Sequence, residues 1–177
     1  KCFWGRFPVV RASSLFYYAK GGDVAQILYA MKYHARKKLC CRMGEYMAGE
    51  LCDSGFFEGI DYLLPVPLFS SRLRQRGYNQ SELLARGISC VTGIPLCTDA
   101  VVRSRNNATQ THKSGYARWQ NVDRLFLPTP HAANLHDKHI LLVDDVLTTG
   151  ATLVACADAL LGVENIKISV LTLAWAR

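Results

Sequence analysis

The stretch from Ile140 to Thr152 reads I-L-L-V-D-D-V-L-T-T-G-A-T, and its pattern predicts the fold of this chain. The four leading apolar residues do not alternate with polar ones, which is typical of a parallel strand buried on both faces. A segment with apolar residues at helical spacing follows directly, at Leu153, Val154, Ala157, Leu160 and Leu161. The order of strand, turn and helix indicates an α/β fold, in which helices flank a central, mostly parallel sheet.

The turn between this strand and this helix has the composition of a phosphate-binding site. It contains five small residues: Thr148, Thr149, Gly150, Ala151 and Thr152. In parallel sheets, ligands bind where strands end and helices begin. Small residues allow the backbone N–H groups of a turn to converge, and the helix dipole adds partial positive charge. We therefore expect this turn to bind a phosphate, with the threonine hydroxyls as further donors.

Asp144 and Asp145 follow the apolar run and precede the turn by two residues. Two neighbouring carboxylates at the mouth of a buried strand repel each other and lose hydration, so they need a compensating partner. A sugar diol could donate one hydroxyl to each carboxylate, and a divalent cation could bind through their oxygens. The structural alternative is a solvated pair of loop residues.

The segment from Val143 to Thr152 resembles the signature of the phosphoribosyltransferases of type I fold, which is an apolar strand, two acids and a T-T-G-x-T loop. The resemblance implies that Asp144 and Asp145 hold the ribose hydroxyls of phosphoribosyl pyrophosphate and that the loop holds its 5′-phosphate. It also implies a Mg²⁺ ion near the two acids, bound directly or indirectly. Receiver domains of response regulators also carry an acid pair after an apolar strand, but theirs lies near the N-terminus.

The composition favours a single domain over residues 1–177, of which about 1–14 form a residual N-terminal segment. A chain of 177 residues with 50% hydrophobic content can bury a substantial core. Lysine and arginine number 21 against 14 aspartate and glutamate residues, so the net charge is +7. This charge suits a polyanionic ligand or a nucleic acid, but it is also compatible with ordinary solubility.

The cysteine pattern and the lack of long apolar runs indicate a cytoplasmic protein. The seven cysteines include no C-x-x-C pair and mostly lie in apolar segments, which favours reduced, buried thiols. No run of about 18 apolar residues occurs, so no transmembrane helix is predicted. The first residues also lack the continuous apolar core of a signal peptide.

A second anion site is predicted where another strand ends. Apolar residues from Ile60 to Val66 predict a strand that stops at the prolines of P-V-P, residues 65–67. Three arginines follow at positions 72, 74 and 76, and Asn79 with Glu82 has the spacing of a capping box that opens a helix. Arginines and a helix N-terminus that converge at a strand end suit pyrophosphate. The alternative is a short basic surface helix.

The rest of the chain contains further predicted elements. Helices are expected over 23–31 and 39–51, and strands over 15–18, 96–102, 125–127 and 166–175, the last of which moves into the centre of the sheet. Residues 103–113 are almost without apolar side chains, which is typical of a mobile lid, and residues 116–122 resume a helical stripe. Three histidines, His131, His136 and His139, lack a metal-ligand pattern and are expected to face solvent. Basic residues at 36–42 could touch nucleic acid, although a solvated face is the simpler interpretation.

Several motifs resemble the ComF family of competence-associated, phosphoribosyltransferase-like proteins. They are P-V-P at 65–67, R-G-Y-N-Q at 76–80, L-L-A at 83–85, T-Q-T at 109–111, Arg118, Asn121, Phe126 and the acid-pair loop. The resemblance extends from about Leu15 to Trp175, and it implies a type I phosphoribosyltransferase fold and a link to DNA uptake in bacteria. It also implies five residues around pyrophosphate: Pro67, Arg76, Gly77, Asn79 and Arg105. Family members usually carry a cysteine-rich zinc ribbon ahead of this domain, which this chain lacks, so no zinc is expected.

These observations lead to two hypotheses about function. The first is a glycosyltransferase in which a nitrogen nucleophile displaces magnesium-bound pyrophosphate from C1 of the ribose. The acid pair would stabilise the positive charge that develops on the sugar, and Arg76 and Arg105 would stabilise the leaving group. No general base for the acceptor stands out. The second hypothesis is a non-catalytic regulatory protein that senses a nucleotide in the same pocket and contacts DNA or competence proteins.

Overall fold

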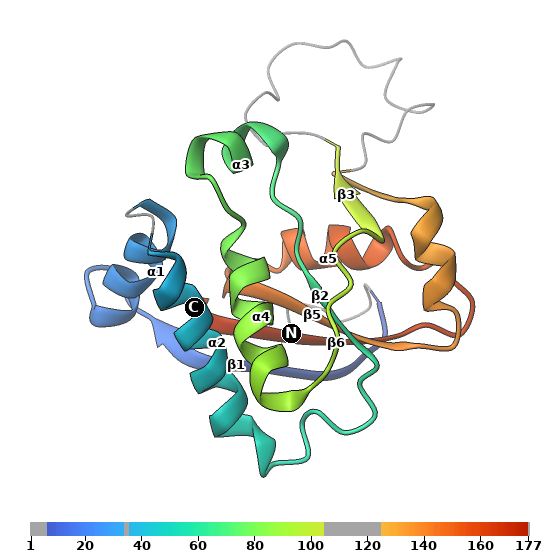
Figure 1. Cartoon of the computed structure of the whole chain (residues 1–177), viewed down its shortest axis with the longest axis horizontal. Coiled ribbons are helices and arrows are strands. Elements are labelled where there is room, and N and C mark those ends of the chain that lie inside the picture. The colour runs from blue at the N-terminus through green and yellow to red at the C-terminus, as the bar shows by residue number, and fades with distance from the viewer. Residues whose placement is uncertain (1–6, 34–35, 105–124, 177) are drawn as a thin grey trace.

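A computed structural model describes residues 7–33, 36–104 and 125–176 and has a parallel sheet at its centre (Figure 1). The sheet has the strand order β1 (Val9–Tyr18), β6 (Lys167–Ala176), β5 (His139–Leu147) and β2 (Tyr62–Pro65), and each neighbouring pair is parallel. Helices flank it, so the predicted α/β class is confirmed. The last strand, β6, lies between β1 and β5, in the interior of the sheet as predicted.

The two faces of the sheet have separate hydrophobic cores because successive side chains of a strand point to opposite faces. Ile140 and Leu142 of β5 pack on one face with α5 (Ala151–Asp158) and with the 3-10 helix η1 (Pro130–Leu135). Leu141 and Val143 pack on the other with α1 (Asp23–Tyr33), α2 (Lys37–Cys52) and α4 (Gln80–Thr92). All four of these strand residues are fully buried, which explains their unbroken apolar run.

Helices α2 and α4 pack closely through two glycines. A Cβ atom added to Gly44 would lie 2.0 Å from the carbonyl oxygen of Leu84, and one added to Gly87 would lie 2.0 Å from that of Cys41. No side chain fits at either position without moving a backbone. The contact therefore fixes the position of α4 relative to α2, and the first residues of α4 reach the carboxyl end of β5.

A smaller antiparallel pair stands at the carboxyl edge of the main sheet, formed by β3 (Val101–Arg103) and β4 (Phe126–Pro128). The helix α3 (Ser70–Arg76) lies at the same end of the molecule (Figure 1). Strand β3 is shorter than the predicted strand over 96–102, because residue 96 makes only an isolated bridge to Leu63 and residues 97–100 are irregular or bent. The lid over 103–113 and the helical stripe over 116–122 fall, apart from residues 103 and 104, outside the described residues.

Two expectations about polar residues were wrong. Strand β1 begins at Val9 and not at Leu15, so residues 9–14, assigned to a residual segment, belong to the sheet. The polar residues of β1 interrupt its apolar pattern, so the sequence did not predict the start of this strand. One of them, Ser14, is accommodated by a hydrogen bond between its hydroxyl and that of Thr172. His139 is buried, because β5 begins there and its Nε2 lies 2.8 Å from the hydroxyl of Ser169. Burial lowers the pKa of His139.

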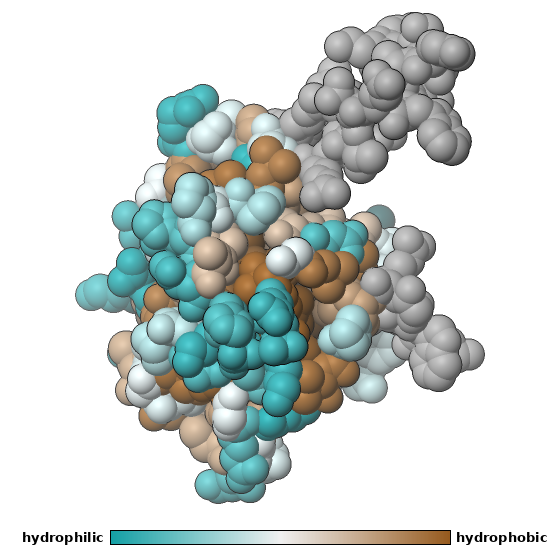
Figure 2. Space-filling model, turned by 90° about the vertical axis from the view of Figure 1, so that its right-hand side faces the viewer, coloured by the Kyte–Doolittle hydropathy of each residue, from teal (hydrophilic) through white to brown (hydrophobic). Residues whose placement is uncertain are grey.

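The remaining surface predictions have mixed outcomes. His131 and His136 are exposed as predicted. The six cysteines within the described residues are free thiols, but Cys52 and Cys90 are exposed, so the expectation of buried thiols fails for these two. In the described part of the chain, no helix has the length and apolarity needed to cross a membrane. On the face that carries η1, hydrophilic residues gather in the middle and hydrophobic ones lie in patches beside them (Figure 2).

Candidate functional site

A pocket of about 260 Å³ opens at the carboxyl end of β5 and β2. Seven segments contribute to its wall, and most of the side chains are polar or charged. The lining residues are Lys32, Tyr33, Val66, Pro67, Leu68, Arg72, Arg76, Gln80, Ser81, Arg103, Asp144, Asp145, Val146, Thr148 and Thr152. The pocket therefore joins the predicted acid pair, part of the predicted phosphate turn and part of the predicted arginine site.

The acid pair is buried inside the pocket. Asp144 is 8% exposed and Asp145 is 4% exposed, so the alternative of a solvated loop pair is wrong. Both residues are still part of β5, which continues to Leu147. Asp144 Oδ1 accepts hydrogen bonds from the hydroxyl of Ser81 at 2.8 Å and from the backbone N–H of Asp145 at 2.9 Å. Burial, and then the charge of Asp145, raise the pKa of Asp144 well above the usual carboxyl range.

Lys32 supplies a counter-charge that the sequence did not predict. Its Nζ lies 2.7 Å from Asp145 Oδ2, and the two groups form an ion pair without hydrogen-bond geometry. Lys32 is in the last turn of α1, more than a hundred residues before the acid pair in the chain. Only the packing of α1 on the sheet brings the two together, so no local pattern could have identified this lysine.

The predicted phosphate turn lies where β5 passes into α5. Thr148 and Thr152 line the pocket. Gly150 has a φ of 80° and caps the N-terminus of α5, a backbone conformation that favours glycine. The hydroxyl of Thr149 accepts a hydrogen bond from the backbone N–H of Ala151 at 3.4 Å. The first N–H groups of a helix lack partners within the helix, so the start of α5 offers donors beside the acid pair.

Three arginines also line the pocket. Arg72 and Arg76 come from α3, as predicted, whereas Arg74 is not among the lining residues. The third is Arg103, from β3, which the sequence placed at the start of the lid. Within the described part of the chain, none of the three lining arginines forms an ion pair with an acidic side chain.

Arg103 is held in an unusual environment for a guanidinium group. It lies over the ring of Phe126, with 5.3 Å between its central carbon and the ring centroid. Its Nε is buried without a hydrogen-bond partner in the described structure. Burial, and then the charge of Arg72, lower the pKa of Arg103. A buried, unpartnered donor next to another cation is a favourable place for an anion.

The residues predicted around pyrophosphate fall into two groups. Pro67 and Arg76 line the pocket, and Arg76 donates a hydrogen bond to Gln80 Oε1. Gly77 ends α3 with a φ of 78°, and Asn79 caps α4, where its Oδ1 accepts from the N–H of Ser81 at 3.1 Å. These two residues shape the frame of the pocket and are not among its lining residues. Arg105 lies outside the described residues.

Asn79 also connects the two loops that frame the pocket. Its Nδ2 donates to the carbonyl oxygen of Val66 at 3.0 Å, directly after β2. The same side chain thus holds the P-V-P loop and presents Ser81 to Asp144. Glu82, the predicted partner of Asn79 in a capping box, pairs instead with Arg86 at 2.7 Å.

Comparison with known proteins agrees with this geometry. The phosphoribosyl transferase domain family matches residues 74–176. Competence protein F of Haemophilus influenzae is 37% identical over 108 residues, which cover 60% of this chain and 47% of that protein. DNA utilization protein YhgH of Escherichia coli K12 is 30% identical over 142 residues, which cover 78% and 61%. Competence protein ComFC of Bacillus subtilis is 34% identical over 99 residues, which cover 56% and 38%.

The chain spans between about two fifths and three fifths of the length of these relatives. The family match, by contrast, covers more than half of this chain and contains α4, β5, the phosphate turn and β6. The parallel sheet with its flanking helices has the architecture that this family implies. The chain belongs to the phosphoribosyl transferase domain family and is a ComF-family, phosphoribosyltransferase-like protein.

Proposed function

We propose that this protein binds phosphoribosyl pyrophosphate with Mg²⁺ and transfers the phosphoribosyl group to a nitrogen acceptor, releasing pyrophosphate. The observation that carries the proposal is the buried pair Asp144 and Asp145, which faces a pocket lined by a helix N-terminus and three arginines. Burying two adjacent carboxylates costs several kcal/mol, by general estimates, unless partners compensate them. Lys32 compensates one of them, and a ligand with hydroxyl donors would compensate both.

The chemistry of the pocket suits the three parts of this ligand. The turn from Thr148 to Thr152 offers N–H and hydroxyl donors for the 5′-phosphate. Asp144 and Asp145 would accept hydrogen bonds from the ribose hydroxyls. Arg72, Arg76 and Arg103, which have no carboxylate partner within the described structure, would bind pyrophosphate. One ligand would therefore satisfy both the acids and the cations of the pocket.

The side chains of the pocket are compatible with Mg²⁺ but not with a metal held by protein alone. Among the described residues, no group of three or more His, Cys, Asp and Glu side chains could hold a metal ion. Mg²⁺ keeps several waters and is often bound through one or two carboxylates together with phosphates of a substrate. Asp144 and Asp145 would supply these carboxylates. When bound, the ion would neutralise charge on the leaving pyrophosphate.

The transfer breaks the bond between C1 and the pyrophosphate oxygen and forms a bond between C1 and the acceptor nitrogen. Positive charge develops on the sugar ring as the leaving group departs. Asp144 and Asp145 would stabilise this charge, and the arginines would stabilise the charge on pyrophosphate. Lys32 pairs with Oδ2 of Asp145, so a sugar hydroxyl would bind the other carboxylate oxygen or share Oδ2 with the lysine.

Calorimetric titration with phosphoribosyl pyrophosphate, with and without Mg²⁺, tests the binding step. A ligand that binds only the folded state adds about 2.7 kcal/mol of stability at roughly a hundred times its dissociation constant, so the melting temperature should also rise. Release of pyrophosphate in the presence of candidate acceptors tests the transfer. A melting curve that saturating ligand leaves unchanged would contradict the assignment of the pocket.

A second candidate function is a DNA-contacting regulatory protein that uses the pocket as a nucleotide sensor. It is suggested by the names of the relatives, which refer to competence and DNA utilization, and by the net charge of +7. The two functions are separable. Binding to DNA would weaken steeply as salt concentration rises, whereas transfer requires pyrophosphate release.

A further inference from the structure

We infer that Lys32, held in place through the hydroxyl of Tyr78, is a resident cation of the acid pair, so that the pair binds the sugar of its ligand without a divalent ion. The inference rests on the proposed function, because it assigns a role within the same pocket. Under this assignment, Mg²⁺ is needed only for the pyrophosphate part of the ligand.

Protein groups alone compensate both carboxylates of the pair. Lys32 Nζ lies 2.7 Å from Oδ2 of Asp145, an oxygen that is buried and has no hydrogen-bond partner within the described structure. Oδ1 of Asp144 accepts hydrogen bonds from the hydroxyl of Ser81 and from a backbone N–H. Two adjacent buried carboxylates would otherwise repel each other strongly. The ammonium group therefore supplies the counter-charge that a metal ion would otherwise provide.

The ammonium group also competes with such an ion for the same atom. An ion bound to Oδ2 of Asp145 would share that oxygen with Nζ of Lys32, and two cations so close together repel each other, most of all in a buried site. Among the described residues, no cluster of three or more His, Cys, Asp and Glu side chains could hold the ion instead. The acid pair alone is therefore not expected to bind Mg²⁺, which phosphate oxygens of pyrophosphate would hold.

A tyrosine in the turn between α3 and α4 fixes the end of α1 that carries the lysine. Tyr78 is buried, and its hydroxyl donates a hydrogen bond of 2.6 Å to the carbonyl oxygen of Met31, the residue before Lys32. Carbonyl groups in the last turn of a helix lack partners within the helix, so this bond replaces a missing one. The side chain of Met31 is fully buried as well. The core of the protein thus sets the position of the ammonium group.

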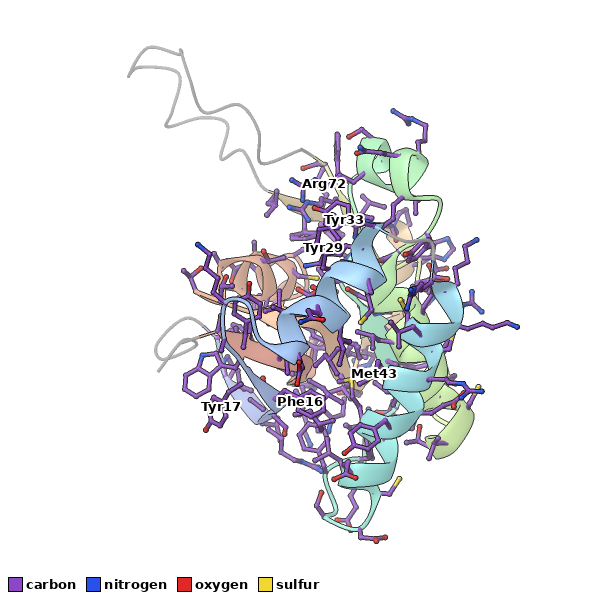
Figure 3. The ribbon with its side chains drawn as sticks, turned by 90° about the vertical axis from the view of Figure 1, so that its left-hand side faces the viewer. Phe16, Tyr17, Tyr29, Tyr33, Met43 and Arg72 are labelled. Carbon is purple, nitrogen blue, oxygen red and sulfur yellow. The ribbon has the colours of Figure 1, made fainter. Side chains whose placement is uncertain are left out.

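Lys32 differs in this respect from the arginines of the pocket. Arg72, Arg76 and Arg103 line the pocket without an ion pair to an acidic side chain in the described part of the chain. Figure 3 shows Arg72 at the same end of the molecule as Tyr33, the residue after Lys32. One cation is therefore committed to the acids, whereas the three arginines are available to phosphates.

Titration of ribose 5-phosphate in EDTA and in MgCl₂ tests the inference. The parent protein should bind this ligand equally well in both solutions. Lys32→Met keeps a side chain of similar length but removes its charge, so it should bind roughly ten- to a hundredfold more weakly in EDTA. MgCl₂ should restore most of this affinity. The variant should also bind Mn²⁺ without ligand, seen as a loss of the electron paramagnetic resonance signal of the free ion, whereas the parent should not.

Two further variants test the position of the charge. Tyr78→Phe keeps the ring and loses only the hydroxyl, so it should show the same dependence on Mg²⁺ to a smaller extent. Lys138 also pairs with an aspartate, with 3.7 Å between its Nζ and Oδ1 of Asp61, but it precedes β5, at the opposite end of this strand from the pocket. Lys138→Met is therefore the matched control and should behave like the parent.

The possible failures are distinct. If the parent binds neither ribose 5-phosphate nor phosphoribosyl pyrophosphate, the proposed function is wrong, and the role of Lys32 fails with it. If the parent binds phosphoribosyl pyrophosphate but binds ribose 5-phosphate only with Mg²⁺ or not at all, Lys32 is no substitute for a metal ion. An unchanged affinity of Lys32→Met in EDTA, a loss that Mg²⁺ does not reverse, or no binding of Mn²⁺ by this variant would overturn the inference as well. If Tyr78→Phe behaves like the parent, Tyr78 does not position the lysine.

Discussion

The phosphate turn and the arginine cluster are two walls of one pocket, but they are built differently. The turn is one continuous stretch from Thr148 to Thr152, which follows β5 directly and includes the first two residues of α5. The cluster of Arg72, Arg76 and Arg103 is assembled from α3 and β3, which are separated in the chain by the whole of α4. The turn therefore depends on local backbone geometry, whereas the cluster depends on the packing of distant elements.

This difference predicts which changes will affect each wall. A mutation far from the pocket can disturb the assembled wall through the helices that carry it. The turn should be more resistant, because β5 lies inside the sheet and brings the turn with it.

The largest effect is expected from Gly87→Ala in α4. The added Cβ would lie 2.0 Å from the carbonyl oxygen of Cys41, so α2 and α4 must move apart. We expect the free energy of unfolding to fall by about 3 kcal/mol, measured by chemical denaturation. Gly49→Ala is the matched control in α2, because nothing lies within 4 Å of the added atom. It should be stabilising by about 0.5–1 kcal/mol, and equal effects at the two sites would disprove the close helix contact.

The next effect concerns Asp144→Asn and Asp145→Asn, which remove a charge and nearly preserve shape. If each carboxylate accepts from a ribose hydroxyl, each change should cost about 1.5–3 kcal/mol of binding, or roughly ten- to a hundredfold in affinity for phosphoribosyl pyrophosphate. Affinity for free phosphate, which the turn would bind, should change much less. Calorimetric titration with both ligands measures this difference. Equal losses would mean that the acid pair supports the turn and does not bind the sugar.

A smaller effect is expected from Arg103→Gln, which tests the assembled wall. Loss of one cation should weaken pyrophosphate binding about tenfold, because hydrogen bonds to charged groups contribute about 1.5 kcal/mol or more. Arg74→Gln is the control, since Arg74 is on the same basic helix as Arg72 and Arg76 but is not among the lining residues. If both variants lose affinity equally, general positive charge is responsible and not the position of Arg103.

The smallest effect is a pH dependence of stability in the unliganded protein. Burial raises the pKa of Asp144 in the folded state, so the folded protein binds this proton more tightly than the unfolded chain does. The stabilising contribution of the protonated form is complete below the unfolded pKa, near 4, and is lost as the pH rises towards the folded pKa. The Asp144→Asn variant has no carboxyl group to titrate at this position, so its stability does not fall in this way. As the pH rises from 5 to 8, the variant should therefore gain stability relative to the parent, by about 1 kcal/mol. If the difference in melting temperature between the variant and the parent stays constant over this range, the raised pKa of Asp144 is contradicted.

The sequence predicted the continuous parts of the site and missed the parts that other elements supply. The strand, the acid pair and the turn lie within thirteen consecutive residues, and their periodicity and residue types indicated a phosphate-binding strand end. Lys32, Ser81 and Arg103 were not predicted, because their roles depend on which elements pack together. The burial of His139 was missed for the same reason, since its partner Ser169 belongs to a strand about thirty residues further along the chain.

Local sequence was sufficient for the class of fold, the order of most of its helices and strands and the position of the acid pair. These follow from hydrophobic periodicity and from the conformational preferences of small residues, which act over a few residues of chain. The tertiary structure alone decided that Lys32 neutralises Asp145, that Asn79 holds a loop and presents Ser81, and that Arg103 completes the cationic wall. Charges and hydrogen-bond partners act across space, and only the packing of α1, α4 and β3 brings these groups within reach of each other.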